Sequence, residues 1–138
     1  MSNSSGSVIM LMGRVLLCSI FLISGVTKIG SFSSLIPYLD AKGLPFPAIA
    51  LGGAMAVEIF GGLAILAGFR ARIAAWLLFL FVIVSSLIFH SFWAMQGVQR
   101  EVSTIMFLKN LAIMGGLLIL AANGAGGYSL DARRSASA

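Results

Sequence analysis

The chain runs AIALGGAMAVEIFGGLAILAG (residues 48–68), FRAR (69–72) and IAAWLLFLFVIVSSLIFHSFWAM (73–95) without interruption. Each long run is almost wholly apolar and reaches the ~20 residues that an α-helix needs to cross the ~30 Å hydrocarbon core of a bilayer. The four residues between the runs allow only a tight turn, so we expect two antiparallel helices that are neighbours in space. This stretch predicts a helical hairpin embedded in a membrane.

Two further apolar runs, residues 8–27 and 104–122, flank this hairpin and are also long enough to span a bilayer. The composition agrees, because 59% of the 138 residues are hydrophobic and the mean hydropathy is +1.06. Charged residues make up only 9%, against about 25% in soluble domains. These values exclude a water-soluble domain and a disordered chain. We therefore predict a single all-α domain over residues 1–138, an integral membrane bundle of four transmembrane helices.

The loop over residues 28–47 carries a helical pattern of its own. Its apolar residues recur at helical spacing: Phe32, Leu35, Ile36 and Leu39. Pro37 fits such a helix only in the first turn, where its missing N–H is not needed. We predict a short interfacial helix that ends near Gly43. The tail over residues 123–138 is rich in Gly and Ala, and we expect it to be flexible.

The basic residues indicate topology rather than nucleic-acid binding. The net charge is +5, but the cations are scattered singly between apolar runs, so they form no stripe that could follow phosphates. One group of segments (first span, second loop, tail) holds Arg14, Arg70, Arg72, Arg133 and Arg134, and the other (first and third loops) holds Lys28, Lys42 and Arg100. This bias favours an N-in, C-in, multi-pass protein of the bacterial cytoplasmic (inner) membrane, in contact with anionic membrane lipids.

Four ionisable side chains fall within the predicted spans, where an unpartnered charge costs roughly 2.5–3.5 kcal/mol. They are Arg14, Glu58, His90 and Lys109. Glu58 and Lys109 lie on helices that enter from the same side, so both side chains lean toward His90 and Lys28. We predict a polar pocket that opens to the periplasm and is formed by Glu58, His90, Lys109, Asn110 and Lys28. Its predicted wall consists of Phe89, Phe92, Trp93, Gly61 and Gly62.

A structural interpretation of the same residues stays open at this point. A Glu–Lys pair can fix how helices assemble without binding a ligand, and paired glycines can serve helix packing. His90 lies among aromatic residues of the kind that form an interfacial belt, and Lys28 and Arg14 can act as membrane anchors. With one His and one Cys, we expect no zinc site, disulfide or two-thiol relay, and we predict no metal ligand or catalytic residue.

Several short motifs, taken together in their order, resemble the DoxX family, especially its inner-membrane members. They are FLISGVTK (21–28), GLP (43–45), EIFGG (58–62), GFRAR (68–72), FHSFW (89–93), FLKNL (107–111), GG (115–116) and YSLD (128–131). The resemblance extends from about Arg14 to Asp131 and implies a four-helix integral membrane protein. Some members of that family are subunits of a thiosulfate:quinone oxidoreductase. Others are associated with membrane complexes that link superoxide dismutase and a sulfurtransferase to thiol redox balance.

Three functions follow from these observations, and we rank them in this order. The first is a quinone-linked or accessory component of a membrane redox system, in which Glu58, His90 and Lys109 contact a quinone head group and a redox enzyme partner supplies electrons. The second is a non-catalytic membrane scaffold. The third is a small-molecule permease, formed as a homo-oligomer, in which buried Glu, His and Lys relay protons. Whether the chain is itself an enzyme is left open.

Overall fold

A computed structural model describes residues 4–137 and shows the predicted all-α fold. Within these residues, four helices are long and apolar enough to cross a membrane. They are α1 (Ser4–Gly30), α3 (Pro47–Ala67), α4 (Ala71–Phe89, continued by the 3-10 helix η1, Phe92–Ala94) and α5 (Gly97–Asn123). Two shorter helices are α2 (Phe32–Ala41) and α6 (Leu130–Ala136). The prediction of a four-span helical bundle is confirmed.

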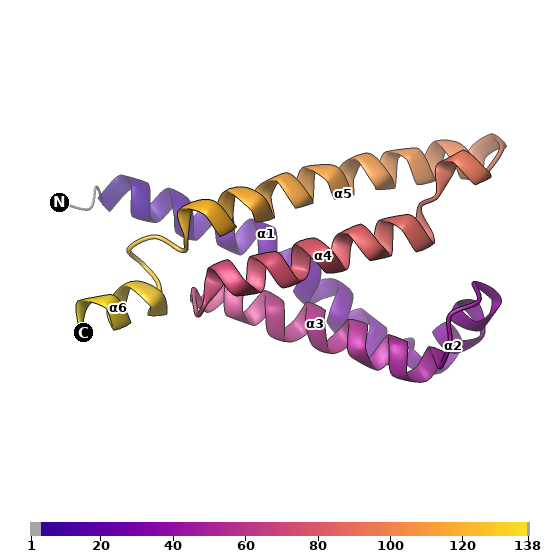
Figure 1. Ribbon diagram of the computed structural model, residues 1–138, viewed down its shortest axis with the longest axis horizontal. Helices are drawn as coiled ribbons and strands as arrows, with labels where there is room; N and C mark the ends of the chain where they lie inside the picture. Colours follow the sequence, from indigo (N-terminus) through magenta and orange to yellow (C-terminus); the bar gives the residue numbers. More distant parts are fainter. Residues whose placement is uncertain (1–3, 138) are drawn as a thin grey trace.

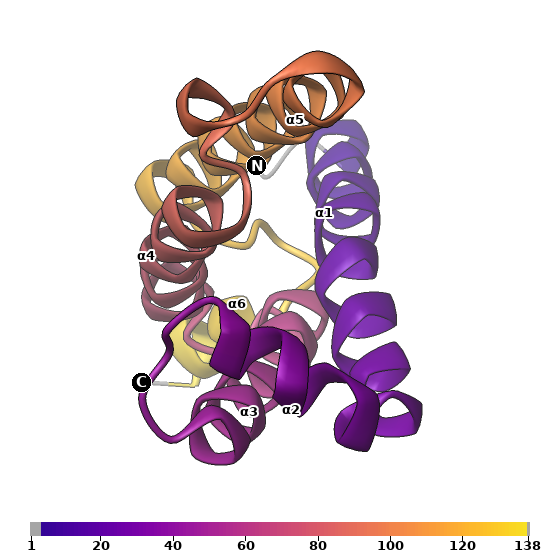
Figure 2. The same cartoon turned by 90° about the vertical axis from the view of Figure 1, so that its right-hand side faces the viewer.

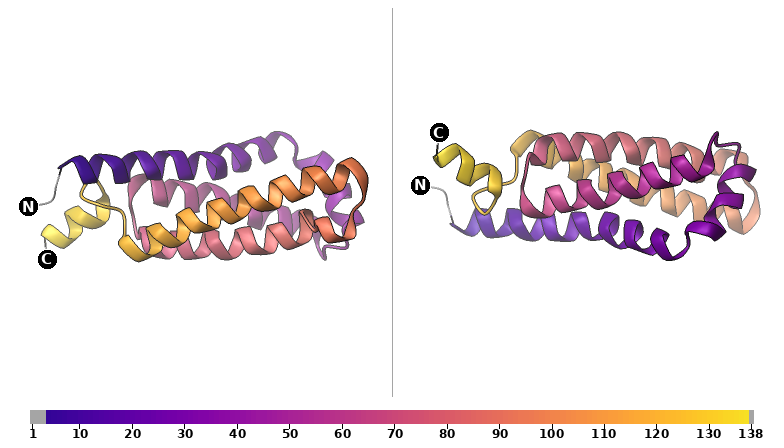
Figure 3. Two further views of the ribbon diagram at one scale, coloured as in Figure 1. Left: turned by 90° about the horizontal axis from the view of Figure 1, so that it is seen from above. Right: turned by 90° about the horizontal axis from the view of Figure 1, so that it is seen from below.

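The helices run antiparallel along the chain and form a ring in which α1 packs on α3, α3 on α4, and α4 on α5 (Figures 1 and 2). The contact that would close the ring, between α1 and α5, is slight. Both ends of the described chain lie at the same end of the bundle, which we call the termini end (Figure 3). Helix α2 lies across the opposite end, which we call the α2 end.

The hairpin between α3 and α4 shows why the chain turns where it does. Helix α3 ends at Gly68, whose φ of +66° lies in the left-handed region that glycine adopts without strain. A Cβ on Gly68 would overlap the guanidinium of Arg14 and lie 2.4 Å from the Cβ of Ser129, so the close packing also requires glycine. The expected tight turn between antiparallel neighbours therefore forms.

The tightly packed core lies toward the termini end. Two glycines of α3 allow neighbouring helices to approach, because Leu78 of α4 fills the space beside Gly61 and Leu22 of α1 fills the space beside Gly62. The buried apolar cluster consists of Cys18, Phe21, Ile65, Ala74, Ala75, Leu78, Val82, Met114, Leu117, Leu120 and Ala121. Large apolar side chains also cover the outer faces of the long helices, as expected for helices in contact with lipid.

Several boundaries differ from those predicted. Helix α4 ends at Phe89 rather than near residue 95, because His90 takes a non-helical conformation (φ −124°, ψ 36°) before η1 begins. Helix α5 begins at Gly97, ahead of the predicted start at residue 104, because a helix can extend beyond the apolar segment that crosses the hydrocarbon.

The first-loop helix and the tail bring two further differences. Helix α2 is present as predicted, but it begins at Phe32, so that Pro37 lies inside it and not in its first turn. The carbonyl of Ser33, which Pro37 leaves without a donor, belongs to an exposed residue that water can reach. The tail, expected to be flexible, instead contains α6, and the N–H of Asp131 donates to the carbonyl of Gly68 over 2.9 Å.

Candidate functional site

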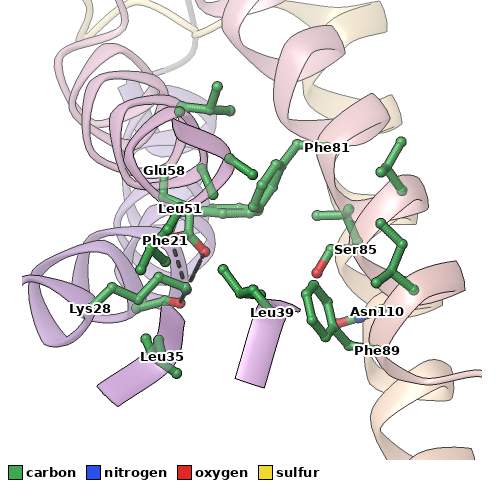
Figure 4. A pocket seen from close by; sticks show the side chains of 18 of the residues that line it. Phe21, Lys28, Leu35, Leu39, Leu51, Glu58, Phe81, Ser85, Phe89 and Asn110 are labelled. Atoms are coloured by element: carbon green, nitrogen blue, oxygen red, sulfur yellow. Dashed lines mark hydrogen bonds and ion pairs between the residues drawn. The ribbon is translucent and has the colours of Figure 1, made fainter. Parts of the chain in front are cut away.

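A cavity of about 620 Å³ opens between the helices near the α2 end (Figure 4). One side is formed by the α1–α3 pair together with α2, and the other side by the α4–α5 pair. Most of its lining is apolar, and Phe21, Leu39, Leu51, Phe81 and Phe89 contribute large side chains. Polar side chains enter it from both sides, which makes it a pocket for a molecule with both apolar and polar parts.

An ion pair forms the polar group on the α1–α3 side. Nζ of Lys28 lies 2.9 Å from Oε2 and 3.0 Å from Oε1 of Glu58 (Figure 4). The hydroxyl of Ser24 donates to Oε1 of Glu58 over 2.9 Å and accepts from Lys28, one turn further along α1. The side chain of Glu58 is only 6% exposed and that of Lys28 is 27% exposed. Both charges are therefore balanced inside the protein.

The backbone of α1 makes this pairing possible. Gly25 faces α3, where a Cβ would lie 2.6 Å from Cγ1 of Ile59 and 3.3 Å from Cβ of Glu58. Only glycine allows the two helices to approach so closely at this level. Lys28 also lies in the last turn of α1, where a cation interacts favourably with the negative end of the helix dipole.

Neutral polar side chains line the opposite wall. Ser85 and His90 come from α4 and its cap, and Asn110 comes from α5. The amide of Asn110 donates to the hydroxyl of Ser86 over 2.8 Å, and that hydroxyl donates to the carbonyl of Val82 over 2.6 Å. These bonds fix Asn110 against α4, so the α4–α5 pair presents an ordered polar surface to the cavity.

Five of the predicted site residues line this cavity: Lys28, Glu58, Phe89, His90 and Asn110. Lys109 does not line it, because its side chain is exposed, and the partner of Glu58 is Lys28. Adjacent residues on an α-helix point about 100° apart, so Lys109 cannot face inward where Asn110 does. The expected Glu58–Lys109 pair is therefore replaced by the Glu58–Lys28 pair.

Four predicted wall residues also lie elsewhere. Gly61 and Gly62 leave no space beside Glu58, because Leu78 and Leu22 pack against them. Phe92 and Trp93 pack with Phe107 of α5, with ring centroids 5.4 and 6.0 Å from that of Phe107. The polar cavity residues that sequence reasoning missed are Ser24, Tyr38 and Ser85. Of these, only Ser24 could have been found from the sequence, because it lies one helical turn before Lys28.

Arg14 has a structural place that the sequence did not reveal. Its side chain is almost completely buried (2% exposed), and its Nη1 donates to the carbonyl of Ile65 over 3.4 Å. Its Nη2 donates to the carbonyl of Tyr128 in the tail. Arg14 thus joins α1 to the C-terminal end of α3 and to the tail, where a cation complements the helix dipole. It is neither exposed at an interface nor part of the cavity.

Comparison with known proteins adds the family. The family model described as DoxX matches residues 9–91. The Escherichia coli inner membrane protein YqjF is 37% identical over 124 residues, which cover 88% of each chain. The chain belongs to the DoxX family. Inner membrane protein YphA of the same organism is 33% identical to this DoxX chain over 126 residues, which cover 91% of it and 90% of YphA.

A more distant similarity reaches eukaryotes. The Surfeit locus protein 4 homolog of Schizosaccharomyces pombe is 35% identical over 69 residues, which cover 49% of this DoxX chain and 23% of that protein. No solved structure matches the chain. The expected family and the integral inner-membrane character are therefore confirmed, together with the four-span fold.

Proposed function

We propose that this DoxX protein binds a lipid-soluble quinone in the cavity at the α2 end, as a quinone-linked or accessory component of a membrane redox system. The observation that carries the proposal is the composition of the cavity, a large apolar volume with polar side chains on two opposite walls. A quinone has the same character, because it combines an apolar ring and tail with two carbonyl oxygens that accept hydrogen bonds.

The charge balance of the cavity supports an uncharged ligand. Lys28 and Glu58 neutralise each other, and Ser24 completes their hydrogen bonds. Neither charge is therefore free to pair with a charged group of a ligand. A ligand with a net charge would lose its hydration in a largely apolar space and gain no opposite charge in return. Quinones are neutral in the oxidised form and in the fully reduced form.

The wall formed by α4 and α5 supplies hydrogen-bond donors for a quinone carbonyl. Asn110 uses one amide hydrogen for Ser86 and keeps a second one, while His90 and Ser85 line the same wall. Reduction of a quinone to a quinol takes up two electrons and two protons. In the proposed function a partner redox enzyme supplies the electrons, and His90 transfers protons to the carbonyl oxygen that it contacts.

We further propose the N-in, C-in orientation for this protein. Arg70 and Arg72 begin α4 and Arg133 and Arg134 lie on α6, so four arginines gather at the termini end. The α2 end carries Lys28, Lys42 and Arg100. The positive-inside rule then assigns the termini end to the cytoplasm and the quinone cavity to the periplasmic half of the membrane.

One observation favours a second function, a non-catalytic scaffold. The tail is held against the bundle by Arg14 and Asp131, and the exposed Arg133 and Arg134 of α6 are thereby presented on an ordered surface. Such a surface suits an acidic face of a partner protein. The two functions are compatible, because α6 lies at the termini end and the cavity lies near the α2 end, so a partner docked at α6 leaves the cavity free.

The test is quinone binding by the purified protein in a mild detergent. Co-purified quinone is extracted and identified by mass spectrometry, and ubiquinone with a short tail is then titrated into quinone-free protein. We expect near-stoichiometric binding that is weakened at least tenfold by His90→Ala and by Asn110→Ala, each of which removes a donor of the α4–α5 wall, a loss of about 1.4 kcal/mol or more of binding free energy. The matched control is Lys109→Ala, which changes a lysine within a span but outside the cavity.

Two results would overturn the proposal. Wild-type protein that neither retains nor binds quinone would exclude the cavity as a quinone site and favour the scaffold. Equal loss of binding in Lys109→Ala and in His90→Ala would show that the effect does not arise in the cavity. An oxidised-minus-reduced spectrum of the same sample checks for a bound haem, which would require a different assignment of His90.

A further inference from the structure

We infer that the ligand reaches this cavity from within the bilayer, through a lateral opening between α3 and α4. We call this opening the portal and define it by Gly53 and Val57 of α3 and Val84 and Ile88 of α4. The inference rests on the proposed function and adds to it that the ligand is a molecule dissolved in the hydrocarbon. It also makes Gly53 and Val57 the residues that control access.

The two helices pack closely in the part of the hairpin nearer the turn. There Leu78 of α4 packs against the backbone of α3 at Gly61, where a Cβ would lie 3.0 Å from Cγ of Leu78. Toward the α2 end the two helices separate in space (Figure 1), and the cavity occupies the volume between them. Side chains line this volume without filling it, and the exposed ones mark where it faces lipid.

Both borders of the portal have the same geometry. Gly53 and Val57 are four residues apart on α3, and Val84 and Ile88 are four residues apart on α4, so each pair lies on one face of its helix. Val57 is 37% exposed and Val84 is 55% exposed, although both line the cavity. A residue that lines a cavity and is also exposed marks the place where the cavity opens. The portal therefore opens through the lipid-facing side of the bundle.

At the α2 end, apolar side chains cover part of the cavity. Leu39 of α2 is buried (6% exposed) over the cavity, and the ring of Tyr38 stacks on that of Phe89, with centroids 6.1 Å apart and planes inclined by 22°. This contact joins α2 to the end of α4. A polar solute approaching along the bundle axis meets this apolar cover, whereas a lipophilic molecule approaching from the side does not.

The opposite flank, between α1 and α5, is less suited to an apolar molecule. Ile20 of α1 is 48% exposed and lines the cavity there. However, Lys109 lies on α5 at i−4 and i−7 from Ile113 and Gly116, two residues that face α1, so a charged side chain borders this flank. Closer to the termini end, a second hollow of about 520 Å³ lies along this flank, and the buried Arg14 is among its lining residues. The portal between α3 and α4 carries no charged residue on either border.

The chain offers a sharp test at two adjacent glycines. A Cβ on Gly53 would meet no atom within 4 Å, and the same holds for Gly52. Gly53→Leu together with Val57→Phe therefore adds bulk to the portal without a clash at residue 53. Gly52→Leu is the matched control, because it makes the same change on the same helix at a residue that does not line the cavity. Ile20→Phe adds bulk at the other flank.

The first experiment uses no quinone. Trp76→Phe and Trp93→Phe remove the native tryptophans, and Phe81→Trp introduces a fluorescent reporter at a cavity residue. The protein is reconstituted into vesicles of phosphatidylcholine with brominated acyl chains, which quench tryptophan on contact. We expect strong quenching, its loss on Gly53→Leu/Val57→Phe, and full quenching with Gly52→Leu and with Ile20→Phe. Unchanged reporter emission in unbrominated lipid verifies the fold of each variant.

The inference is overturned if the reporter is not quenched in the parent protein, or if Ile20→Phe protects it and the portal variant does not. The second experiment measures the rates at which short-tail ubiquinone binds and dissociates in unbrominated vesicles. We expect the portal variant to slow both the association and the dissociation rate by about tenfold, because a narrower opening hinders passage in both directions, whereas Gly52→Leu changes neither rate. If the parent binds no ubiquinone but its quenching responds to the portal variant, the proposed function fails and the portal stands.

Discussion

Lys28 and Glu58 show how a single contact sets the character of the cavity. The fold buries Glu58 and leaves Lys28 partly exposed, and the two charges, 2.9 Å apart, compensate each other. A buried pair of this kind contributes little net stability, but removing one member leaves the other uncompensated, which is costly. The position of the pair on α1 and α3 also ties together the two helices that form one side of the cavity.

This reasoning gives a prediction at the scale of the residue. Lys28→Ala leaves the carboxylate of Glu58 without its cation in a largely apolar environment and should reduce the free energy of unfolding by about 3 kcal/mol. The double variant Lys28→Met/Glu58→Gln removes both charges and should recover most of that loss. Thermal unfolding in detergent measures both, with Lys109→Met as the matched control. A double variant as unstable as Lys28→Ala would contradict the compensation.

At the scale of the element, the tail acts as a cap for α4. The two carboxylate oxygens of Asp131 accept the N–H groups of Arg70 and Ala71 over 2.7 and 2.9 Å. The first N–H groups of a helix have no partner within it, and they carry the positive end of its dipole. A segment far along the chain therefore supplies the cap that the three-residue turn between α3 and α4 (residues 68–70) has no room to provide.

A second prediction follows from this cap. Asp131→Ala should destabilise the start of α4 by about 1–2 kcal/mol, the range found when a capping side chain is removed. The amides of Arg70 and Ala71 should then exchange with deuterium about tenfold faster, because local opening becomes easier by about 1.4 kcal/mol. Ser135→Ala, on the same short helix, serves as the control. Equal exchange in the two variants would show that the contact contributes nothing.

At the scale of the whole molecule, the bundle consists of a tightly packed half at the termini end and a more open half at the α2 end. The glycine contacts of α3 and the buried cluster hold the first half together, whereas the cavity separates the α1–α3 and α4–α5 pairs in the second. This division gives the molecule one half that sets the fold and another that can hold a ligand.

The orientation of the whole molecule gives a third prediction. Green fluorescent protein fused after residue 138 should fluoresce, because the N-in, C-in orientation leaves it in the cytoplasm, where it folds. Alkaline phosphatase inserted after Gln96, between η1 and α5, should be active, because that enzyme needs the periplasm for its disulfides. The reverse pattern at both sites would assign the four arginines of the termini end to the periplasm.

Hydropathy was sufficient to predict the four spans, because every residue of a span contributes to the same signal. The partner of Glu58 could not be predicted in this way. Lys109 and Asn110 are adjacent on α5, and hydropathy does not indicate which of the two faces the cavity. Depth in the membrane can be estimated from sequence position, but the side of the helix depends on how all the helices pack. The cavity residues on α1 and α3 were found in part because both charges lie in apolar segments.

The order of the tail was missed for a different reason. The hydrogen bonds that order the tail use backbone carbonyl groups: Arg14 donates to the carbonyl of Tyr128, and the carbonyl of Gly68 accepts from the N–H of Asp131. A backbone carbonyl leaves no trace in the sequence. The Gly- and Ala-rich composition of residues 123–127 predicts mobility for an isolated segment. Contacts with residues far earlier in the chain, Arg14 and Gly68, override that tendency.

The contact of Arg14 with Tyr128 has a consequence for biogenesis. Tyr128 follows Arg14 by 114 residues, so α1 is synthesised well before this acceptor exists. Helix α1 must therefore enter the membrane with a guanidinium group that lacks one of its final acceptors, and it acquires that acceptor only after residue 128 has been synthesised. In chains truncated before Tyr128 the guanidinium of Arg14 never gains this hydrogen bond, which gives cellular quality control a way to distinguish truncated copies.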